Sequence, residues 1–214
     1  MKLRVFSLLS ALLLAALLAG CGPSDAGSAA GLSIHFIDVG QANASLLLCG
    51  GQAMLIDGGS AERGSQVSGY LRQLGISYLD FVVCTSADEA HMGGLAAPLY
   101  TCAVGRVLSP APQTDDPVFE HFRRYTEAQG LSPAVPEPGE SFSLGDATVT
   151  VLEPEADPGI LSLQVEHGGV SLRFSGDLEA TLADALPESE DGGAAGNLVA
   201  ESDGASLRLI PPET

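Results

Sequence analysis

Residues 85–94, TSADEAHMGG, place two carboxyl groups and one imidazole within four positions, and a pair of glycines follows after one methionine. Carboxylate oxygens and imidazole nitrogens are common ligands of divalent metals, and a zinc site that does chemistry generally has three protein ligands and a water. Such a bound water has a lowered pKa and can attack an ester. The segment looks like a metal-binding loop that lacks part of its ligand set.

No other catalytic system is suggested by the sequence. There is no Gly-x-Ser-x-Gly elbow and no phosphate-cradling Gly-Lys-Thr loop. The cysteine closest to a candidate histidine is Cys84, seven positions before His91, and its apolar, strand-like surroundings favour a buried, inert thiol. A nucleophilic hydrolase is therefore not expected.

Short apolar runs in front of the loop predict strands that would position it. SIHFIDVG, ASLLLCGG and AMLIDGG follow one another, and a Gly-Gly-Gln turn between the last two suits a hairpin. Over residues 64–75 the apolar period becomes that of a helix, which a glycine closes. YLDFVVCTS then predicts a buried parallel strand that leads into the loop, and a short helix is expected near residues 93–99.

The second half of the chain predicts a different arrangement. VGRVLSP indicates another strand, and residues 117–129 a helix that turns Phe119 and Phe122 inward. ESFSLG, ATVTVLEP, ILSLQVEHGG and VSLRFSGD indicate an antiparallel meander of four strands. Residues 178–186 could form one more helix.

In order and spacing, these segments resemble the soluble hydrolase domain of ComEC-type competence proteins, a branch of the metallo-β-lactamase fold superfamily. IHFIDVGQANASLLL with MLIDGG resembles the family's hFIDVGQGDailI and lIDgG, and FVVCTSADEAHMGGL resembles its metal loop, lSHpDaDHiGGl. VSLRFSGD resembles the strand that ends in a bridging aspartate. The resemblance covers residues 33 to 180 and implies an α/β fold. We expect an αββα sandwich of mixed sheets with outer helices, shortened at the C-terminus.

The resemblance also implies a metal site, of which this chain keeps few ligands. Ser86 stands in place of the first histidine of the loop and Ala90 in place of its second aspartate, whereas Asp88 and His91 remain. The aspartate of the family's GQGD is Asn43, and the late HHGS motif has no counterpart. On this basis neither metal position would reach three protein ligands.

The residual metal candidates are Asp88, His91 and Asp177, which falls at the bridging position, with Asp57 and Glu89 as supporting candidates. A cluster of these four carboxylates would suit magnesium, manganese or calcium better than zinc. Structural roles are the alternative. His91 could cap or pack beneath the following helix, Asp177 could cap a helix, and Asp57 could belong to an Asp-Gly turn.

The N-terminus resembles a bacterial lipoprotein signal. A lysine and an arginine precede an apolar run over residues 5–18, and LAGC at residues 18–21 resembles a lipobox, in which cleavage precedes a lipidated cysteine. The apolar run is shorter than the ~20 residues that a bilayer crossing needs. We therefore expect a signal peptide over residues 1–20 and an extracytoplasmic protein that is anchored to the cell membrane by lipid on Cys21.

The remaining chain divides by composition. We expect residues 21–31 to be the lipidated cysteine and a flexible tether, and the resemblance implies a metallo-β-lactamase-like domain over residues 32–187. Residues 188–214 form an acidic, glycine-rich tail, which we expect to be loosely held apart from a possible last strand at ASLRLI.

The charge of the chain argues against nucleic acid as a partner. The formal net charge is −18 at pH 7. All 27 acidic residues lie after residue 20, and in that part of the chain the only basic side chains besides histidine are arginines. Binding to nucleic acid requires lysines and arginines that neutralise phosphates, and no basic stripe is present.

These features predict a membrane-anchored lipoprotein with a catalytically impaired domain that binds a protein or a small molecule, or serves as a scaffold. No cofactor is expected, or at most zinc, manganese or magnesium with low affinity. The alternative is a metal-dependent hydrolase of phosphodiesters or other esters, with the metal held by Asp88, His91 and Asp177. A solute-binding lipoprotein is a third possibility, and it would require an apolar pocket with convergent polar groups.

Overall fold

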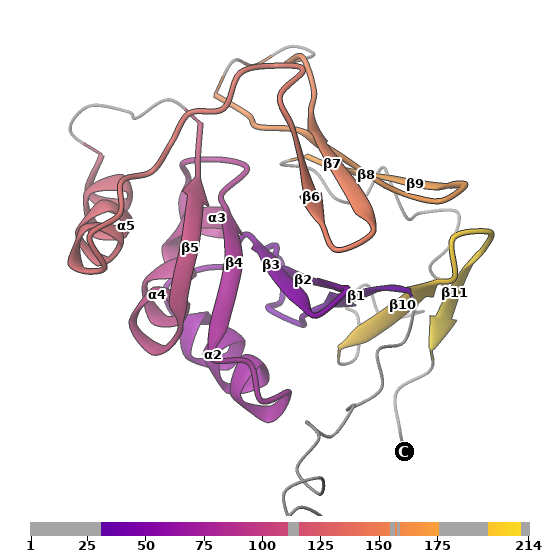
Figure 1. Ribbon diagram of the computed structural model, residues 1–214. Helices are drawn as coiled ribbons and strands as arrows, with labels where there is room; N and C mark the ends of the chain where they lie inside the picture. The colour runs from indigo at the N-terminus through magenta and orange to yellow at the C-terminus, as the bar shows by residue number, and fades with distance from the viewer. Residues whose placement is uncertain (1–30, 111–115, 155–156, 158, 176–196, 211–214) are drawn as a thin grey trace, which may run out of the picture.

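The computed structural model describes residues 31–110, 116–154, 157, 159–175 and 197–210, which form two packed β-sheets with helices beside the larger sheet (Figure 1). The larger sheet has seven strands in the order β11-β10-β1-β2-β3-β4-β5. Its strands are β1 (Leu32–Phe36), β2 (Ser45–Cys49), β3 (Gln52–Ile56), β4 (Tyr78–Val83), β5 (Ala103–Leu108), β10 (Leu198–Ser202) and β11 (Leu207–Ile210). The smaller sheet comprises β6 (Ser141–Leu144), β7 (Ala147–Val151), β8 (Leu163–His167) and β9 (Val170–Phe174), in that order.

The pairing of the strands confirms the predicted change of character along the chain. β2 and β3 form an antiparallel hairpin through Gly50 and Gly51, both of which have positive φ. β3, β4 and β5 are parallel to one another, as the continuous apolar run of β4 predicted. The four strands β6 to β9 form the expected antiparallel meander.

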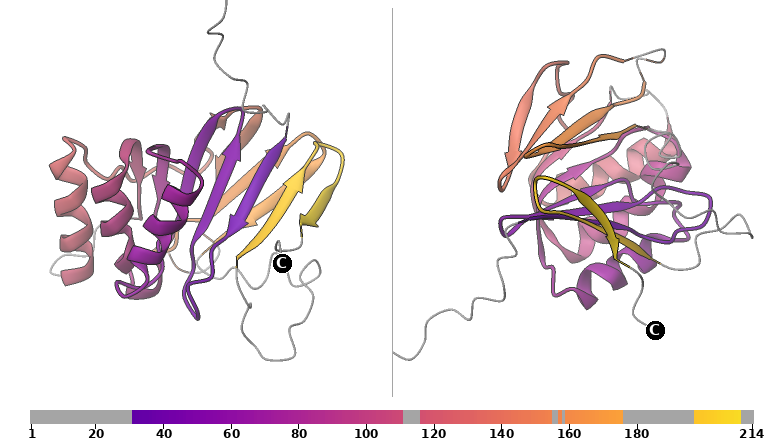
Figure 2. Two further views of the ribbon diagram at one scale, coloured as in Figure 1. Left: turned by 90° about the horizontal axis from the view of Figure 1, so that it is seen from below. Right: turned by 90° about the vertical axis from the view of Figure 1, so that its right-hand side faces the viewer.

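The helices lie on the outer face of the larger sheet (Figure 2). They are α2 (Gly64–Gln73), α3 (Glu89–Met92), the 3-10 helix η1 (Gly93–Leu95), α4 (Ala96–Thr101) and α5 (Pro117–Ala128). α2 and α5 match the predicted ranges closely. The helix expected near residues 93–99 begins earlier, because the Asp88 side chain accepts from the backbone N–H groups of Ala90 and His91 and so caps α3.

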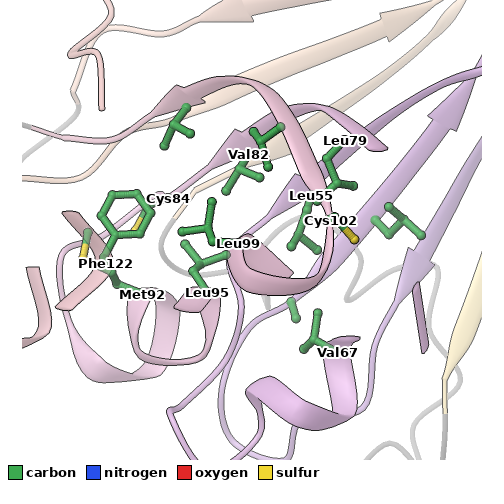
Figure 3. Close-up of a cluster of buried hydrophobic side chains, with 14 of the residues drawn as sticks. Leu55, Val67, Leu79, Val82, Cys84, Met92, Leu95, Leu99, Cys102 and Phe122 are labelled. Atoms are coloured by element: carbon green, nitrogen blue, oxygen red, sulfur yellow. The ribbon is translucent and has the colours of Figure 1, made fainter. Parts of the chain in front are cut away.

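Two apolar cores hold the layers together. One core lies between the helices and the larger sheet and includes Val67, Leu95 and Phe122 (Figure 3). Phe119 and Phe122 are both buried there, which confirms the predicted inner face of α5. The other core lies between the two sheets and is built from alternate residues of their strands, such as Ile34, Val165 and Phe174.

The end of the chain differs from the expectation. We predicted a loosely held segment over residues 188–214 with one possible strand at ASLRLI. That strand is β11, and β10, which was not predicted, precedes it. β10 pairs with β1 along its whole length, so β1 is an interior strand rather than a sheet edge. The composition of β10 gave little indication of a strand, because the segment is poor in large apolar residues. Its backbone hydrogen bonds to β1 can hold it in the sheet nevertheless.

The smaller sheet is not covered by a helix within the described ranges. Its outer face carries polar side chains that suit contact with water, among them Ser141, Ser143, Thr148, Glu166 and Ser171. The helix predicted over residues 178–186 lies outside the described residues. Among the described residues, no helix combines the length and the apolar character needed to cross a membrane.

Glycines allow the two sheets to approach closely at two turns. A Cβ atom on Gly145, in the β6–β7 turn, would lie 2.5 Å from the carbonyl oxygen of Cys49, at the end of β2. A Cβ atom on Gly168, in the β8–β9 turn, would lie 2.3 Å from the carbonyl oxygen of Gly204, between β10 and β11. These contacts fix how the smaller sheet sits on the larger one.

Candidate functional site

Three loops meet at the ends of β1, β3 and β4 and are joined by backbone hydrogen bonds. The backbone N–H of Asn43, between β1 and β2, donates to Ala90 O at 3.2 Å. Gly58 and Gly59, after β3, donate to His91 O and Asn43 O, both at 2.8 Å, and Gly94 donates to Gly59 O at 2.7 Å. The TSADEAHMGG loop is thereby held against both of its neighbours.

Asp88 is surrounded by donors. Its Oδ1 atom accepts from the backbone N–H groups of Ala90 and His91 and lies 2.6 Å from His91 Nδ1. Its Oδ2 atom accepts from the Ser86 hydroxyl at 2.8 Å. Burial alone would raise the pKa of Asp88, but the hydrogen bonds from His91 and Ser86 outweigh it, so the pKa lies below its ordinary value. Asp88 is therefore an ionised cap whose charge is already stabilised by protein groups.

His91 has side-chain partners at both ring nitrogens. Nδ1 faces Asp88, and Nε2 lies 2.8 Å from Nδ2 of Asn43. An amide nitrogen donates, so Nε2 accepts and the ring proton lies on Nδ1, where it is donated to the Asp88 carboxylate. The side chain is buried, with 8% of the residue exposed. The ring thus links the β1–β2 loop to the cap of α3. This role goes further than the capping or packing beneath a helix that the sequence suggested as an alternative to metal binding.

Asp57 lies beneath this loop and is 3% exposed. Its carboxyl group accepts from the backbone N–H of Thr85 at 2.7 Å and from the Thr85 hydroxyl at 2.6 Å. Burial raises the pKa of Asp57 to about 6, an effect that attraction to His91 and the hydrogen bonds from Thr85 only partly offset. Its φ of 60° places it in the left-handed region, which aspartate tolerates. Asp57 thus ties the end of β3 to the start of the loop.

The remaining supporting candidate, Glu89, does not join the others. Its side chain is exposed, and Oε1 accepts from the backbone N–H of Ala61 at 2.9 Å. Asp177 lies outside the described residues, so its position relative to Asp88 and His91 is not described. Cys84 is buried, which raises the pKa of its thiol well above the ordinary value, and its Sγ donates to Ser86 O.

The described side chains do not fit a divalent metal. Among the described residues, no group of three or more histidines, cysteines, aspartates and glutamates converges as metal ligands would. Both nitrogens of His91 are engaged by the protein, and the positions two residues before and two residues after Asp88 carry the hydroxyl of Ser86 and the methyl of Ala90. A metal at His91 would have to displace either Asn43 or Asp88.

The sequence identified the loop but missed three of the residues that organise it. Asn43 was noted only as a replacement, and Thr85 was not considered. Ser86 was likewise read as a lost ligand, although its hydroxyl bonds to Asp88. The signal for Asn43 was chemical, since an amide can donate to a neutral imidazole whereas a carboxylate cannot.

Comparison with known proteins supports the resemblance on which the site was sought. No family model matches the chain. Over 116 residues, which make up 51% of this chain, it is 31% identical to ComE operon protein 3 of Bacillus subtilis (strain 168). The match spans only 15% of that protein's length, so it concerns one part of a much longer chain.

Solved structures with a similar arrangement include metallo-β-lactamases. MEM-A1, a subclass B3 metallo-β-lactamase from a soil metagenome library, matches with a TM-score of 0.50 and 21% identity, over 69% of this chain and 60% of its own. A HARLDQ-motif mutant of the Cronobacter sakazakii metallo-β-lactamase gives a TM-score of 0.49 and 18% identity, over 65% of this chain and 59% of its own. At 21% identity the likeness to MEM-A1 shows the fold alone, which is the predicted metallo-β-lactamase-like fold.

Proposed function

We propose that this chain, which has the metallo-β-lactamase fold and is similar to part of ComE operon protein 3, is a binding or scaffolding lipoprotein without metal-dependent hydrolysis. The proposal places the domain outside the cytoplasm, attached to the membrane by lipid on Cys21. Its partner would be a protein or a small molecule, because the net charge of −18 disfavours nucleic acid.

One observation carries the proposal: both ring nitrogens of His91 are hydrogen-bonded to protein side chains. A catalytic zinc site generally has three protein ligands and a bound water, and His91 could be one of these ligands only through a ring nitrogen that the protein leaves open. The described loop instead presents an imidazole between Asp88 and Asn43, at 2.6 and 2.8 Å. The geometry favours a rigid, preassembled loop surface over a site that would take up a cation.

A rigid loop surface suits binding. The backbone hydrogen bonds among the three loops fix their shape in advance, which reduces the entropy that a partner would have to overcome. The Asp88 side chain remains 51% exposed at the edge of this surface, so it can still meet a partner. The exposed carboxylate favours a partner with hydrogen-bond donors or positive charge.

The test is metal content measured by mass spectrometry on the full chain. The protein is stripped with a chelator, incubated with zinc or manganese, and desalted. We expect less than a tenth of an equivalent of metal to be retained. The Asp177→Ala/His91→Ala double variant should give the same low value, and His121→Ala, at a half-buried histidine of α5 whose ring packs against Tyr125, is the matched histidine control.

Near-stoichiometric metal in the wild-type chain and the His121→Ala variant, but not in the double variant, would contradict the proposal. That outcome would favour the hydrolase alternative. A screen of phosphodiester and other ester substrates, with and without chelator, would then be the next measurement.

A further inference from the structure

We propose that Asn43 is the positioning residue of this site and that its side-chain amide takes the place of a cation at His91. The inference deepens the proposed function, because it names the group that keeps the loops assembled without a metal. It rests on the chain of contacts from Asn43 through His91 and Asp88 to Ser86.

The direction of the hydrogen bonds along this chain is fixed at its two ends. The Asn43 Nδ2 group donates to His91 Nε2, so the imidazole must carry its proton on Nδ1 and donate to Asp88. The Ser86 hydroxyl donates to the other oxygen of the same carboxylate. The donors of His91 and Ser86 thus both point toward the Asp88 carboxylate, and among the described residues protein groups stabilise its charge.

The Asn43 amide also opposes a cation directly. The partial positive charge of its N–H lies against the lone pair of His91 Nε2, which is where a cation would bind. An aspartate at position 43 could not donate to a neutral imidazole and would instead attract a positive ion to the same place. A single amide nitrogen thus decides whether this position repels or attracts a metal.

The backbone of Asn43 explains why its side chain is held at His91. Its N–H donates to Ala90 O and its C=O accepts from Gly59, while the His91 carbonyl accepts from Gly58. Asn43 and His91 are therefore fixed through both main chain and side chain. In this arrangement the three loops close around protein groups, at the place where a metal would otherwise have to hold them.

Nitrogen-15 NMR of the histidine rings in the full chain tests the proposal. At a pH above the ordinary histidine pKa of about 6.5, long-range proton–nitrogen spectra distinguish a protonated from an unprotonated ring nitrogen. We expect His91 to carry its proton on Nδ1, and one equivalent of zinc to leave its signals unchanged. In Asn43→Ala the fraction with the proton on Nε2 should rise, and amide exchange of Gly59 should accelerate several-fold. His91→Ala provides the assignment.

Two further variants keep the test decisive. Gln66→Ala is the matched amide control, because Gln66 Nε2 donates to Asp38 O on the same β1–β2 loop without touching the imidazole; it should leave the His91 tautomer unchanged. Asn43→Asp replaces the side-chain amide nitrogen by a carboxylate oxygen. In this variant zinc should shift the His91 ring signals. If zinc left His91 unchanged in Asn43→Asp as well, the amide would not be what excludes the cation, and the proposal would be wrong.

The outcomes separate this inference from the proposed function. A proton on His91 Nε2 in the wild-type chain, with no response to zinc, would refute the role of Asn43 and leave the proposed function standing. A zinc-dependent shift of His91 in the wild-type chain would refute both.

Discussion

Thr85 donates two hydrogen bonds to the buried carboxyl group of Asp57, one from its backbone N–H at 2.7 Å and one from its hydroxyl at 2.6 Å. Asp57 follows β3 and Thr85 follows β4, so the pair joins the ends of two parallel strands. Leu161, next to the short bridge between Ser86 and Ile160, donates to the Thr85 carbonyl at 2.7 Å. The contact thereby positions the start of the TSADEAHMGG loop.

The burial of Asp57 predicts a pH-dependent loss of stability, which the hydrogen bonds from Thr85 only partly offset. The pKa of Asp57 is raised from 3.8 to about 6, so the folded state holds the proton more tightly than the unfolded chain. The stabilisation that proton binding by Asp57 gives the folded state is complete below the unfolded pKa of 3.8. It is lost as the pH rises through about 6. A rise of this size corresponds to about 3 kcal/mol at neutral pH.

Asp57→Asn should remove that penalty, because asparagine keeps an acceptor for the Thr85 N–H, stays neutral and tolerates positive φ. We expect its free energy of unfolding relative to wild type to increase between pH 4 and pH 7.5 by up to about 3 kcal/mol. Urea unfolding at both pH values measures it. Asp203→Asn is the control, because hydrogen bonds from Ala205 and Ser206 lower the pKa of Asp203, so its pH effect falls mainly below pH 4 and the variant should change little over this interval. A pH-independent difference for Asp57→Asn would contradict the prediction.

Gly94 should not tolerate a side chain. A Cβ atom there would lie 2.0 Å from the carbonyl oxygen of Gly58 and 2.8 Å from that of Ser60, and neither backbone atom can move without shifting the loop after β3. Gly94→Ala should lower the free energy of unfolding by roughly 3 kcal/mol or more. Gly69→Ala, within α2 and with open space around its Cβ, should instead raise it by about 1 kcal/mol. Equal effects in thermal unfolding would show that the close approach is not limiting.

The contact between the sheets at Gly145 can be separated from backbone strain. Gly145 and Gly139 both have positive φ, at 57° and 84°, so alanine at either should cost about 1–2 kcal/mol in backbone energy. Only Gly145 is crowded, since the added Cβ would lie 2.5 Å from Cys49 O, whereas Gly139 has nothing within 4 Å. We expect Gly145→Ala to be less stable than Gly139→Ala by about 1–3 kcal/mol in urea unfolding. Similar losses in both variants would argue against this sheet contact.

The proposed lipid anchor can be tested at Cys21. Cys21→Ser should move the protein from the membrane fraction into the soluble fraction, because two acyl chains at ~0.8 kcal/mol per buried methylene supply the binding free energy. Mass spectrometry of the wild-type protein should show a diacylglyceryl adduct on this cysteine. Cys102→Ser, at a buried free cysteine, should leave the distribution unchanged. Retention of Cys21→Ser in the membrane would contradict the lipoprotein assignment.

Much of the fold was predictable because it depends on local periodicity. The apolar alternation of β6 to β9, the helical period of α2 and the capped start of α5 can each be read within a few residues. β10 was missed because it is held by pairing with β1, more than 160 positions away in the chain, and not by its own composition.

The sequence by itself determined which chemical groups the TSADEAHMGG loop contains. It showed that Asp88 and His91 remain where Ser86 and Ala90 replace ligands, because residue identity is independent of conformation. The tertiary structure decided what those groups do. It brought Asn43 from a loop 48 positions away to within 2.8 Å of the His91 ring, and hydrogen bonds depend on distance and direction, which a linear sequence does not specify.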